Sequence, residues 1–383
     1  MTPRHLAGAR IRAQGLAGPV GATPVEVARS FVAHQGQDAP GVMASLALRS
    51  AGGLEEVLAA VDRGEVVRGY PMRGTVFAVA ADTVAWLTDL CAAGPLRAAI
   101  ARRGALGIEE RDVDRAAEVL AELAAPHSER GRGRGVLRRD LLAAWEEAGI
   151  ATGQGRGYHL LVELIMLGHA VYGPWREQET AVVLADAWLP PGTDLEGAFG
   201  GDRTAAAAEL ALRYLTSHGP ASVQDLAWWS KLPLRTLRPA IEQVRGRLES
   251  GYAGRDGRLH ATADRARGGD GEQLWWRPGL LEEYAAAEKE SMRELLLPGF
   301  DELVLGYRDR LYLMDPERHR ALVPGNNGVF QRAALRRGEV VGTWTRTGRP
   351  GRRSVALTPL RPISERQHAR FEALFAAFPY TAP

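Results

Sequence analysis

The sequence predicts a mainly helical α+β protein, with three tandem winged helix-turn-helix units followed by a small C-terminal β-barrel. Two observations support this prediction. A pattern of three amphipathic helices followed by two short strands occurs three times, and after residue 291 the chain changes to short β-rich runs separated by turn residues. The corresponding domains are residues 1–90, 91–195, 196–290 and 291–383.

The first helix of the first unit has a clear start signal. Thr23 as N-cap, Pro24 at the first helical position and Glu26 three residues after the cap form a capping box. Val27 and Phe31 lie four residues apart and give the helix one buried face. The segment therefore predicts a short helix with a fixed beginning.

The end of this helix is the most informative part of the chain. We expect the helix to stop at Gly36, and the next one to begin just before Pro40, so that Gln35 and Gln37 lie at a corner between two helices. An amide neither gains nor loses a proton near neutral pH, which makes the pair a candidate for fixing a water molecule. The alternative is ordinary polarity at a helix end. Asp38 is a candidate base or electrostatic stabiliser, or else the N-cap of the second helix.

The remaining elements follow from the same periodicities. The expected helices of the three units are 24–35, 40–50 and 54–62, then 114–125, 138–145 and 158–167, then 205–217, 222–230 and 233–244. The expected strand pairs are 65–68 with 75–79, 170–173 with 180–184, and 248–252 with 258–261. A helical stretch at 279–294 precedes expected strands at 328–330, 339–344 and 354–357. These strands are expected to form a small β-barrel or a curved sheet, closed by a final helix at 363–377.

The composition is that of an ordinary globular chain, with 45% hydrophobic and 25% charged residues. No apolar run approaches the roughly 20 residues that cross a bilayer, and no apolar signal-peptide core follows Met1. The single Cys91 excludes an internal disulfide and a cysteine-rich metal site. We expect a cytoplasmic protein that makes no membrane contact.

Residue spacing and residue counts argue against several kinds of chemistry. The nine histidines show no metal-site spacing, and no P-loop or convincing dinucleotide fingerprint is present, so neither a metal nor a cofactor is expected. Lys231 and Lys289 are the only lysines, which argues against Schiff-base chemistry. The net charge of +2 does not by itself indicate a nucleic-acid partner.

Two groups of arginines are candidate phosphate contacts. The first group, interleaved with glycine, is Arg130, Arg132, Arg134, Arg138 and Arg139. The second group, on an expected hairpin turn, is Arg346, Arg349, Arg352 and Arg353. A basic hairpin can enter a minor groove, which favours the second group, and a solvated surface is the alternative for both.

The chain resembles the AlkZ/YcaQ-like winged-helix DNA glycosylases nearly from end to end. Short motifs in the family's order carry the resemblance. They are Arg12–Leu16, His34–Asp38, Pro71–Thr75, Gly157–Leu161, Asp225–Ser230, Leu297–Glu302, Gly306–Arg310, Val323–Phe330 and Val341–Trp344. Each motif is weak alone, and their number and order identify the chain as a member of the family.

The resemblance implies tandem winged helices and a β-barrel around a channel for double-stranded DNA. It also implies a monofunctional glycosylase that removes bulky, cationic N7-alkylguanine adducts, including interstrand crosslinks, in DNA repair or in self-resistance to alkylating antibiotics. The family's catalytic Gln-x-Gln motif maps onto Gln35 and Gln37, with Asp38 as a candidate support. The implied DNA-binding residues are Arg73, Asn326, Asn327 and the hairpin arginines. A monomer that associates with the nucleoid through DNA is expected.

Two positions depart from the family pattern. Gly36 stands where the family usually has a small hydrophobic residue, and Phe77 stands where it often has a histidine.

Two other functions fit the same modules. A non-catalytic regulator or damage sensor would bind DNA without the glutamines, and a winged-helix assembly or dimerisation module would show no salt-dependent affinity for DNA.

Overall fold

The computed structural model describes residues 4–18, 21–177, 179–253, 259–261, 272–326, 328–349 and 352–380. The chain divides into two compact units. Unit 1 consists of Met1–Leu54 and Ala208–Pro383, and unit 2, Glu55–Ala207, is inserted between these segments. Helices α4 (Gly53–Asp62) and α12 (Arg203–His218) span the two boundaries. The division into four domains stays a prediction.

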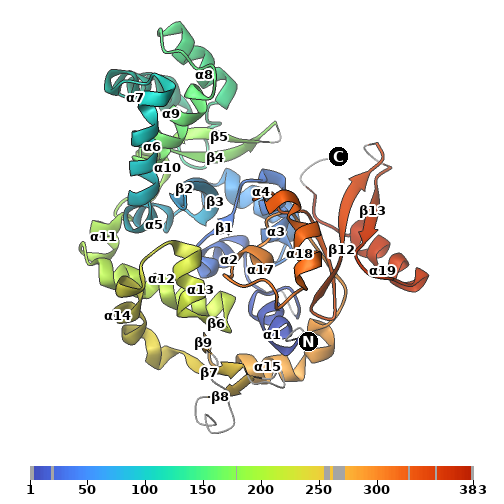
Figure 1. The fold of residues 1–383 in the computed structure, drawn as a ribbon. Coiled ribbons are helices and arrows are strands. Elements are labelled where there is room, and N and C mark those ends of the chain that lie inside the picture. Colours follow the sequence, from blue (N-terminus) through green and yellow to red (C-terminus); the bar gives the residue numbers. More distant parts are fainter. Residues whose placement is uncertain are drawn as a thin grey trace. The chain divides into compact units, whose positions relative to one another are not determined.

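Unit 1 combines short helices with short strands (Figure 1). Besides α12, its helices are α1 (Arg4–Ala13), α2 (Pro24–Phe31), α3 (Ala39–Ala47), α13 (Val223–Ser230), α14 (Leu234–Val244), α15 (Leu280–Ala286), α16 (Glu288–Ser291), α17 (Glu302–Leu305), α18 (Pro316–Leu322) and α19 (Glu365–Ala376). Its strands are β1 (His34–Gln35), β6 (Ala221–Ser222), β7 (Glu249–Ala253), β8 (Leu259–Ala261), β9 (Gln273–Trp276), β10 (Leu295–Leu297), β11 (Ala333–Arg336), β12 (Glu339–Thr347) and β13 (Ser354–Pro359). The 3-10 turns are η2 (Arg245–Arg247) and η4 (Pro324–Asn326).

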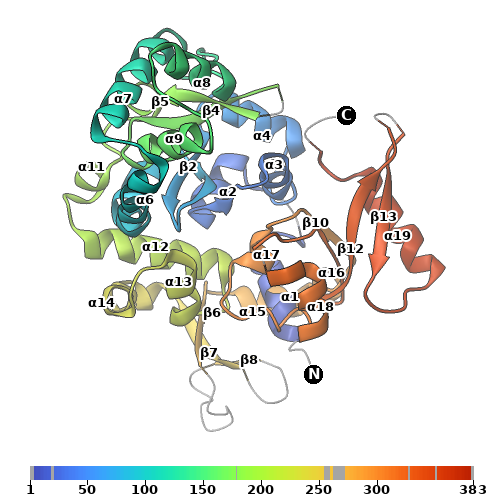
Figure 2. The ribbon, with the colours of Figure 1, turned by 45° about the horizontal axis from the view of Figure 1, so that its top comes forward.

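The C-terminal part of unit 1 is an open antiparallel sheet, so the prediction of a β-barrel was wrong. Its strand order is β10-β11-β12-β13, and within the described residues its two edge strands do not pair with each other. Four strands are too few to close around a packed interior. The apolar face is covered instead by α19, which lies along β13 (Figures 1 and 2) and packs Phe371 and Phe375 near Trp344. Residues 328–330, predicted as a strand, have no regular structure.

The other sheet of unit 1 has the strand order β6-β9-β7-β8. Its strands are antiparallel, with Ser222 opposite Leu274 and Gly251 opposite both Leu274 and Ala261. Strand β6 leads directly into α13, whose N-cap Ser222 forms a capping box with Asp225. Helix α13 corresponds to the helix expected at 222–230.

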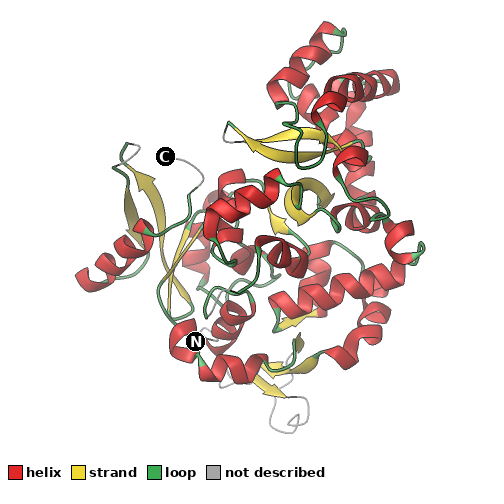
Figure 3. Cartoon of the chain, turned by 180° about the vertical axis from the view of Figure 1, so that it is seen from behind, coloured by secondary structure: helices red, strands yellow, loops and turns green. Residues whose placement is uncertain are grey.

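Unit 2 contains four antiparallel strands in the order β3-β2-β4-β5. These strands are β2 (Val66–Met72), β3 (Thr75–Ala80), β4 (Ala170–Arg176) and β5 (Glu179–Leu184). Its helices, besides α4, are α5 (Val84–Cys91), α6 (Ala93–Leu106), α7 (Glu110–Ala124), η1 (Ala125–His127), α8 (Arg138–Glu147), α9 (Arg156–Met166), α10 (Ala185–Trp188) and α11 (Leu195–Phe199). Helices predominate in both units (Figure 3).

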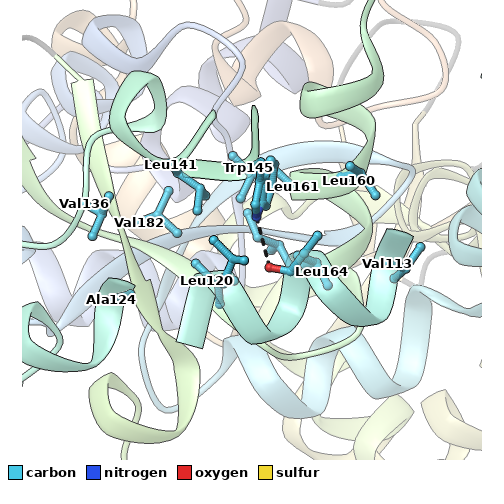
Figure 4. Packing of buried hydrophobic residues seen from close by; sticks show 14 of the residues in the cluster. Val113, Leu120, Ala124, Val136, Leu141, Trp145, Leu160, Leu161, Leu164 and Val182 are labelled. Atoms are coloured by element: carbon cyan, nitrogen blue, oxygen red, sulfur yellow. Dashed lines mark hydrogen bonds between the residues drawn. The ribbon is translucent and has the colours of Figure 1, made fainter. Parts of the chain in front are cut away.

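The core of unit 2 is formed mainly by α7, α8, α9 and the adjoining strands (Figure 4). Val113 and Leu120 of α7 face this core together with Leu164 of α9. Trp145 of α8 is fully buried, and its indole N–H donates a hydrogen bond of 3.0 Å to the carbonyl oxygen of Ala116 (Figure 4). The helical spacing of these residues is the reason that sequence periodicity located α7, α8 and α9.

Each helix and strand expected in the three repeats is present in the described chain, with shifted ends. Their classification as winged helices stays a prediction. The helices that were not expected are α1, α5, α6, α10, α11, α17 and α18. Helix α6 lacked a strong periodic signal because most of its residues are exposed. Within the described residues no single helix is long and apolar enough to cross a membrane. Helices α5 and α6, which are bent by 69° relative to each other, reach the required length and apolarity only when they are taken together.

Replacing Trp145 with Phe is expected to lower the free energy of unfolding by about 2 kcal/mol, because it leaves a cavity and an unbound carbonyl at Ala116. Urea denaturation followed by circular dichroism measures this change. Leu167→Ala, which alters a side chain that is 42% exposed, is the control and should change stability by less than about 1 kcal/mol. Equal stability of Trp145→Phe and the wild type would contradict this description of the core.

Candidate active site

The corner between α2 and α3 begins earlier than its sequence predicts. The capping box of Thr23 and Glu26 is present as expected. However, α2 ends at Phe31 and not at Gly36, because Val32 adopts a positive φ of 68°. This conformation is strained for a β-branched residue and turns the chain out of the helix. Residues 34 and 35 then form the short strand β1, so Gln35 lies on extended backbone rather than at a helix end.

The two glutamines of the corner bind each other. The side-chain Nε2 of Gln35 donates to Oε1 of Gln37 at 3.1 Å, and the backbone N–H of Gln37 donates to Oε1 of Gln35, also at 3.1 Å. Gln35 is only 5% exposed, whereas Gln37 is exposed. Both polar groups of the Gln35 side chain therefore hold Gln37, and the amide of Gln37 is the one that faces solvent.

A buried carboxylate supports this pair from the protein interior. Glu302, 1% exposed, accepts a hydrogen bond of 2.7 Å from the backbone N–H of Gln35. Its other oxygen accepts from the indole Nε1 of Trp229 at 3.1 Å and lies 3.4 Å from Nε2 of His218. No role for Glu302 was predicted from the sequence, where its only signal was its place at the end of the motif Leu297–Glu302.

The neighbouring residue, Asp301, holds the other end of α3. Its carboxylate accepts hydrogen bonds from the two terminal guanidinium nitrogens of Arg49, at 2.7 and 2.9 Å. Both side chains are fully buried. The hydroxyl of Ser45 donates to the same carboxylate at 2.9 Å. Loss of one partner from such a buried pair costs roughly 3–5 kcal/mol because the other charge stays behind without compensation. The ends of α3 are thus fixed by two consecutive acidic residues.

Asp38 occupies the N-cap position of α3, but its side chain makes no capping hydrogen bond. Asp38 is therefore the N-cap residue by its backbone position, as predicted, but its carboxylate does not cap the helix. Gly41 leaves room for that carboxylate, because a Cβ at this position would lie 2.6 Å from Oδ2 of Asp38. The charge of Asp38 also acts on Arg346, since it partly offsets the lowering of the Arg346 pKa by burial and by Arg353.

The hairpin predicted around the second arginine group is present between β12 and β13, whose last pair is Thr347 with Ser354. Arg349 and Arg352, in the turn, are exposed, and Arg353 is half-buried. Arg346 lies against the ring of Tyr380, with 4.5 Å from its guanidinium carbon to the ring centre. Residues 350 and 351 are outside the described part. DNA contact by these arginines stays a prediction.

The other DNA-binding candidates are distributed over both units. In unit 2, Arg73 lies in the turn between β2 and β3 with a φ of 61°, and its guanidinium carbon is 5.6 Å from the ring centre of the buried Phe77. Arg73 lines a groove of about 530 Å³ together with Arg102 and Tyr158. In unit 1, Asn327 and the side chain of Asn326 are outside the described residues.

The first arginine group takes part in local contacts of unit 2. Arg130 donates to the carbonyl oxygen of Gly64 at 3.1 and 3.3 Å. Arg132 pairs with Glu129 at 2.9 Å, and Arg139 pairs with Glu177 at 2.7 Å. These contacts support the interpretation of the group as a solvated, structural surface.

His34 is a buried, neutral neighbour of the glutamines. Its ring stacks on Phe31, with 4.3 Å between ring centres, and within the described chain neither ring nitrogen has a hydrogen-bond partner. Burial lowers its pKa well below 6.5, and the charge of Arg49 acts in the same direction. The arrangement therefore offers an exposed amide and a nearby carboxylate for water, next to the buried ring of His34.

Comparisons with known proteins identify the family and support the fold. A family model described as "DNA glycosylase AlkZ-like" matches residues 28–379. The solved structure of Streptomyces sahachiroi DNA glycosylase AlkZ is similar, with a TM-score of 0.66 and 20% sequence identity over 98% of this chain and 96% of that one. A comparison with curated proteins gave no significant match. The structural likeness, at this identity, supports the fold alone.

Acidification is expected to destabilise the protein through His34. Because the folded pKa of His34 is lowered, the unfolded chain binds its proton more readily, so the free energy of unfolding falls as pH drops below 6.5. Replacing His34 with Phe should reduce this slope between about pH 5 and 6.5. Urea denaturation at several pH values measures it, with the exposed His127→Phe as control. A slope unchanged by His34→Phe would contradict the prediction.

Proposed function

Because this chain belongs to the AlkZ-like family of DNA glycosylases, we propose that it hydrolyses the N-glycosidic bond of bulky, cationic N7-alkylguanine in double-stranded DNA. The observation that supports this most is the Gln35–Gln37 pair, in which a buried amide fixes an exposed one. An amide pair cannot act as an acid near neutral pH, but it can position a water molecule through hydrogen bonds. It suits a leaving base that already carries a positive charge.

The proposed reaction needs no proton for the leaving group. The C1′–N9 bond breaks, and its electron pair moves to the purine, which neutralises the cationic base. An oxocarbenium-like sugar remains, and a water molecule held by Gln37 attacks C1′. The proton of this water passes to the Asp38 carboxylate, which adjoins Gln37 and is not used as a helix cap. Gln35 acts by keeping Gln37 in place.

We propose a monofunctional enzyme without lyase activity. A lyase step requires an amine that forms a Schiff base with the sugar. The corner from residue 31 to 38 contains no lysine, and the ammonium of Lys231 lies 5.1 Å from the ring centre of Trp228. Reductive trapping should therefore capture no covalent adduct with DNA.

The exposure of Gln37 favours a large lesion over a small one. A glycosylase for small lesions encloses a flipped base in a tight pocket, whereas an amide at the surface is accessible to a bulky adduct that stays in the duplex. On this basis we extend the proposal to interstrand crosslinks, and to a role in repair or in self-resistance to alkylating natural products. We also propose that the protein acts as a cytoplasmic monomer associated with the nucleoid.

Replacing Gln37 with Ala is expected to slow base release by about 100-fold or more, because the attacking water loses its positioning group. The assay uses duplex oligonucleotides that carry N7-methylguanine or a bulky N7 adduct, and measures alkali-revealed abasic sites in a single turnover. Binding of the same DNA should change little. Wild-type protein that binds this DNA but releases neither base would favour the non-catalytic regulator or damage sensor.

The turn arginines are expected to contribute phosphate contacts. Replacing Arg349 and Arg352 together with Ala should lower the slope of log affinity against log salt by about 2, one for each lost contact. Fluorescence anisotropy with undamaged duplex DNA measures it. Arg115→Ala, which removes an exposed arginine paired with Glu118, is the control and should keep the wild-type slope. An unchanged slope in the double variant would exclude the turn from the interface.

A further inference from the structure

We propose that Glu302 is a positioning residue for base release: it holds the backbone of Gln35, and Gln35 in turn holds Gln37. This inference rests on the proposed function, in which Gln37 positions water at the substrate. Glu302 itself is buried under the corner and acts only through Gln35.

The contacts of Glu302 show a carboxylate with both oxygens in use. One oxygen accepts from the Gln35 N–H at 2.7 Å, and the other accepts from Trp229 at 3.1 Å and faces His218 at 3.4 Å. Burial lowers the pKa of His218, so its imidazole is neutral at pH 7. A buried carboxylate is tolerated only when hydrogen bonds of this kind replace its water. The position of Gln35 is therefore tied to rigid, fully buried aromatic groups.

The local backbone makes this support necessary. Val32, with a φ of 68°, ends α2 before the glutamines, so the helix does not fix them. Gly36 separates Gln35 from Gln37, and a glycine allows the backbone many conformations. The orientation of Gln37 consequently depends on its two hydrogen bonds to Gln35, and that of Gln35 on Glu302.

The variant Glu302→Gln tests the proposal with little change in volume. One side-chain oxygen is retained, but the new NH₂ group cannot accept the hydrogen bond from the Trp229 N–H. The expected result is a single-turnover rate of base release lowered by 10-fold to about 100-fold, with DNA affinity close to that of the wild type. The control is Glu339→Gln, the same change at a glutamate that is 4% exposed and pairs with Arg4 and Arg361.

A double-mutant cycle separates positioning from general stability. If Glu302 acts through Gln35, Glu302→Gln should add little to the loss already caused by Gln35→Ala. Additive losses, a wild-type rate for Glu302→Gln, or an equal loss in Glu339→Gln at equal thermal stability would each overturn the proposal. Should Glu302→Gln not fold, Trp229→Phe removes one donor to the carboxylate and must give a smaller, equally non-additive loss.

Hydrogen exchange gives a readout that does not depend on catalysis. In Glu302→Gln, peptides that cover residues 32–38 should exchange faster than in the wild type and in Glu339→Gln, because the side chain that accepts from the Gln35 N–H is no longer anchored by Trp229. If the wild type releases no base, the proposed function fails while this measurement still decides whether Glu302 holds the corner. Unchanged exchange at the corner would reject the structural basis of the inference.

Discussion

Two consecutive buried carboxylates, Asp301 and Glu302, are the constraint on which the candidate site depends. Asp301 binds Arg49 after α3, and Glu302 binds the backbone of Gln35 before α3. Burial of two adjacent negative charges is unfavourable unless each is fully satisfied, and here a guanidinium satisfies one and N–H donors satisfy the other. The position of α3 and the orientation of the glutamines are thereby linked to one short segment of the C-terminal part of the chain.

The polar contacts extend from this segment through unit 1. Arg49 also donates to Gln14 at 2.9 Å, and Gln14 donates to the hydroxyl of Tyr307 at 3.0 Å. That hydroxyl donates to the carbonyl oxygen of His218 at 2.8 Å, next to Glu302. Several motifs that identified the family in the sequence thus meet in one buried network. In this chain these motifs therefore support the corner that carries the glutamines.

The sequence was informative where a local signal decides the structure. The capping box at Thr23 and the helical spacing around Trp145 both correspond to real elements. It failed where a long-range contact decides, since no local pattern can reveal that Glu302 lies beneath Gln35 or that Asp38 does not cap α3. The barrel prediction failed for the same reason, because strand runs alone do not show whether the two edge strands pair with each other, and in the described residues they do not. The left-handed Val32 opposes its own propensity and could not be predicted.

The insertion of unit 2 into unit 1 has a consequence for synthesis of the protein. The two glutamines are translated early, but Glu302, 267 residues after Gln35, leaves the ribosome only after the whole of unit 2. A nascent chain that has reached the end of unit 2 carries the amides without the carboxylates that order them. Assembly of the corner is therefore a late folding event, and a chain interrupted before residue 301 would have Gln35 and Gln37 in an unsupported form.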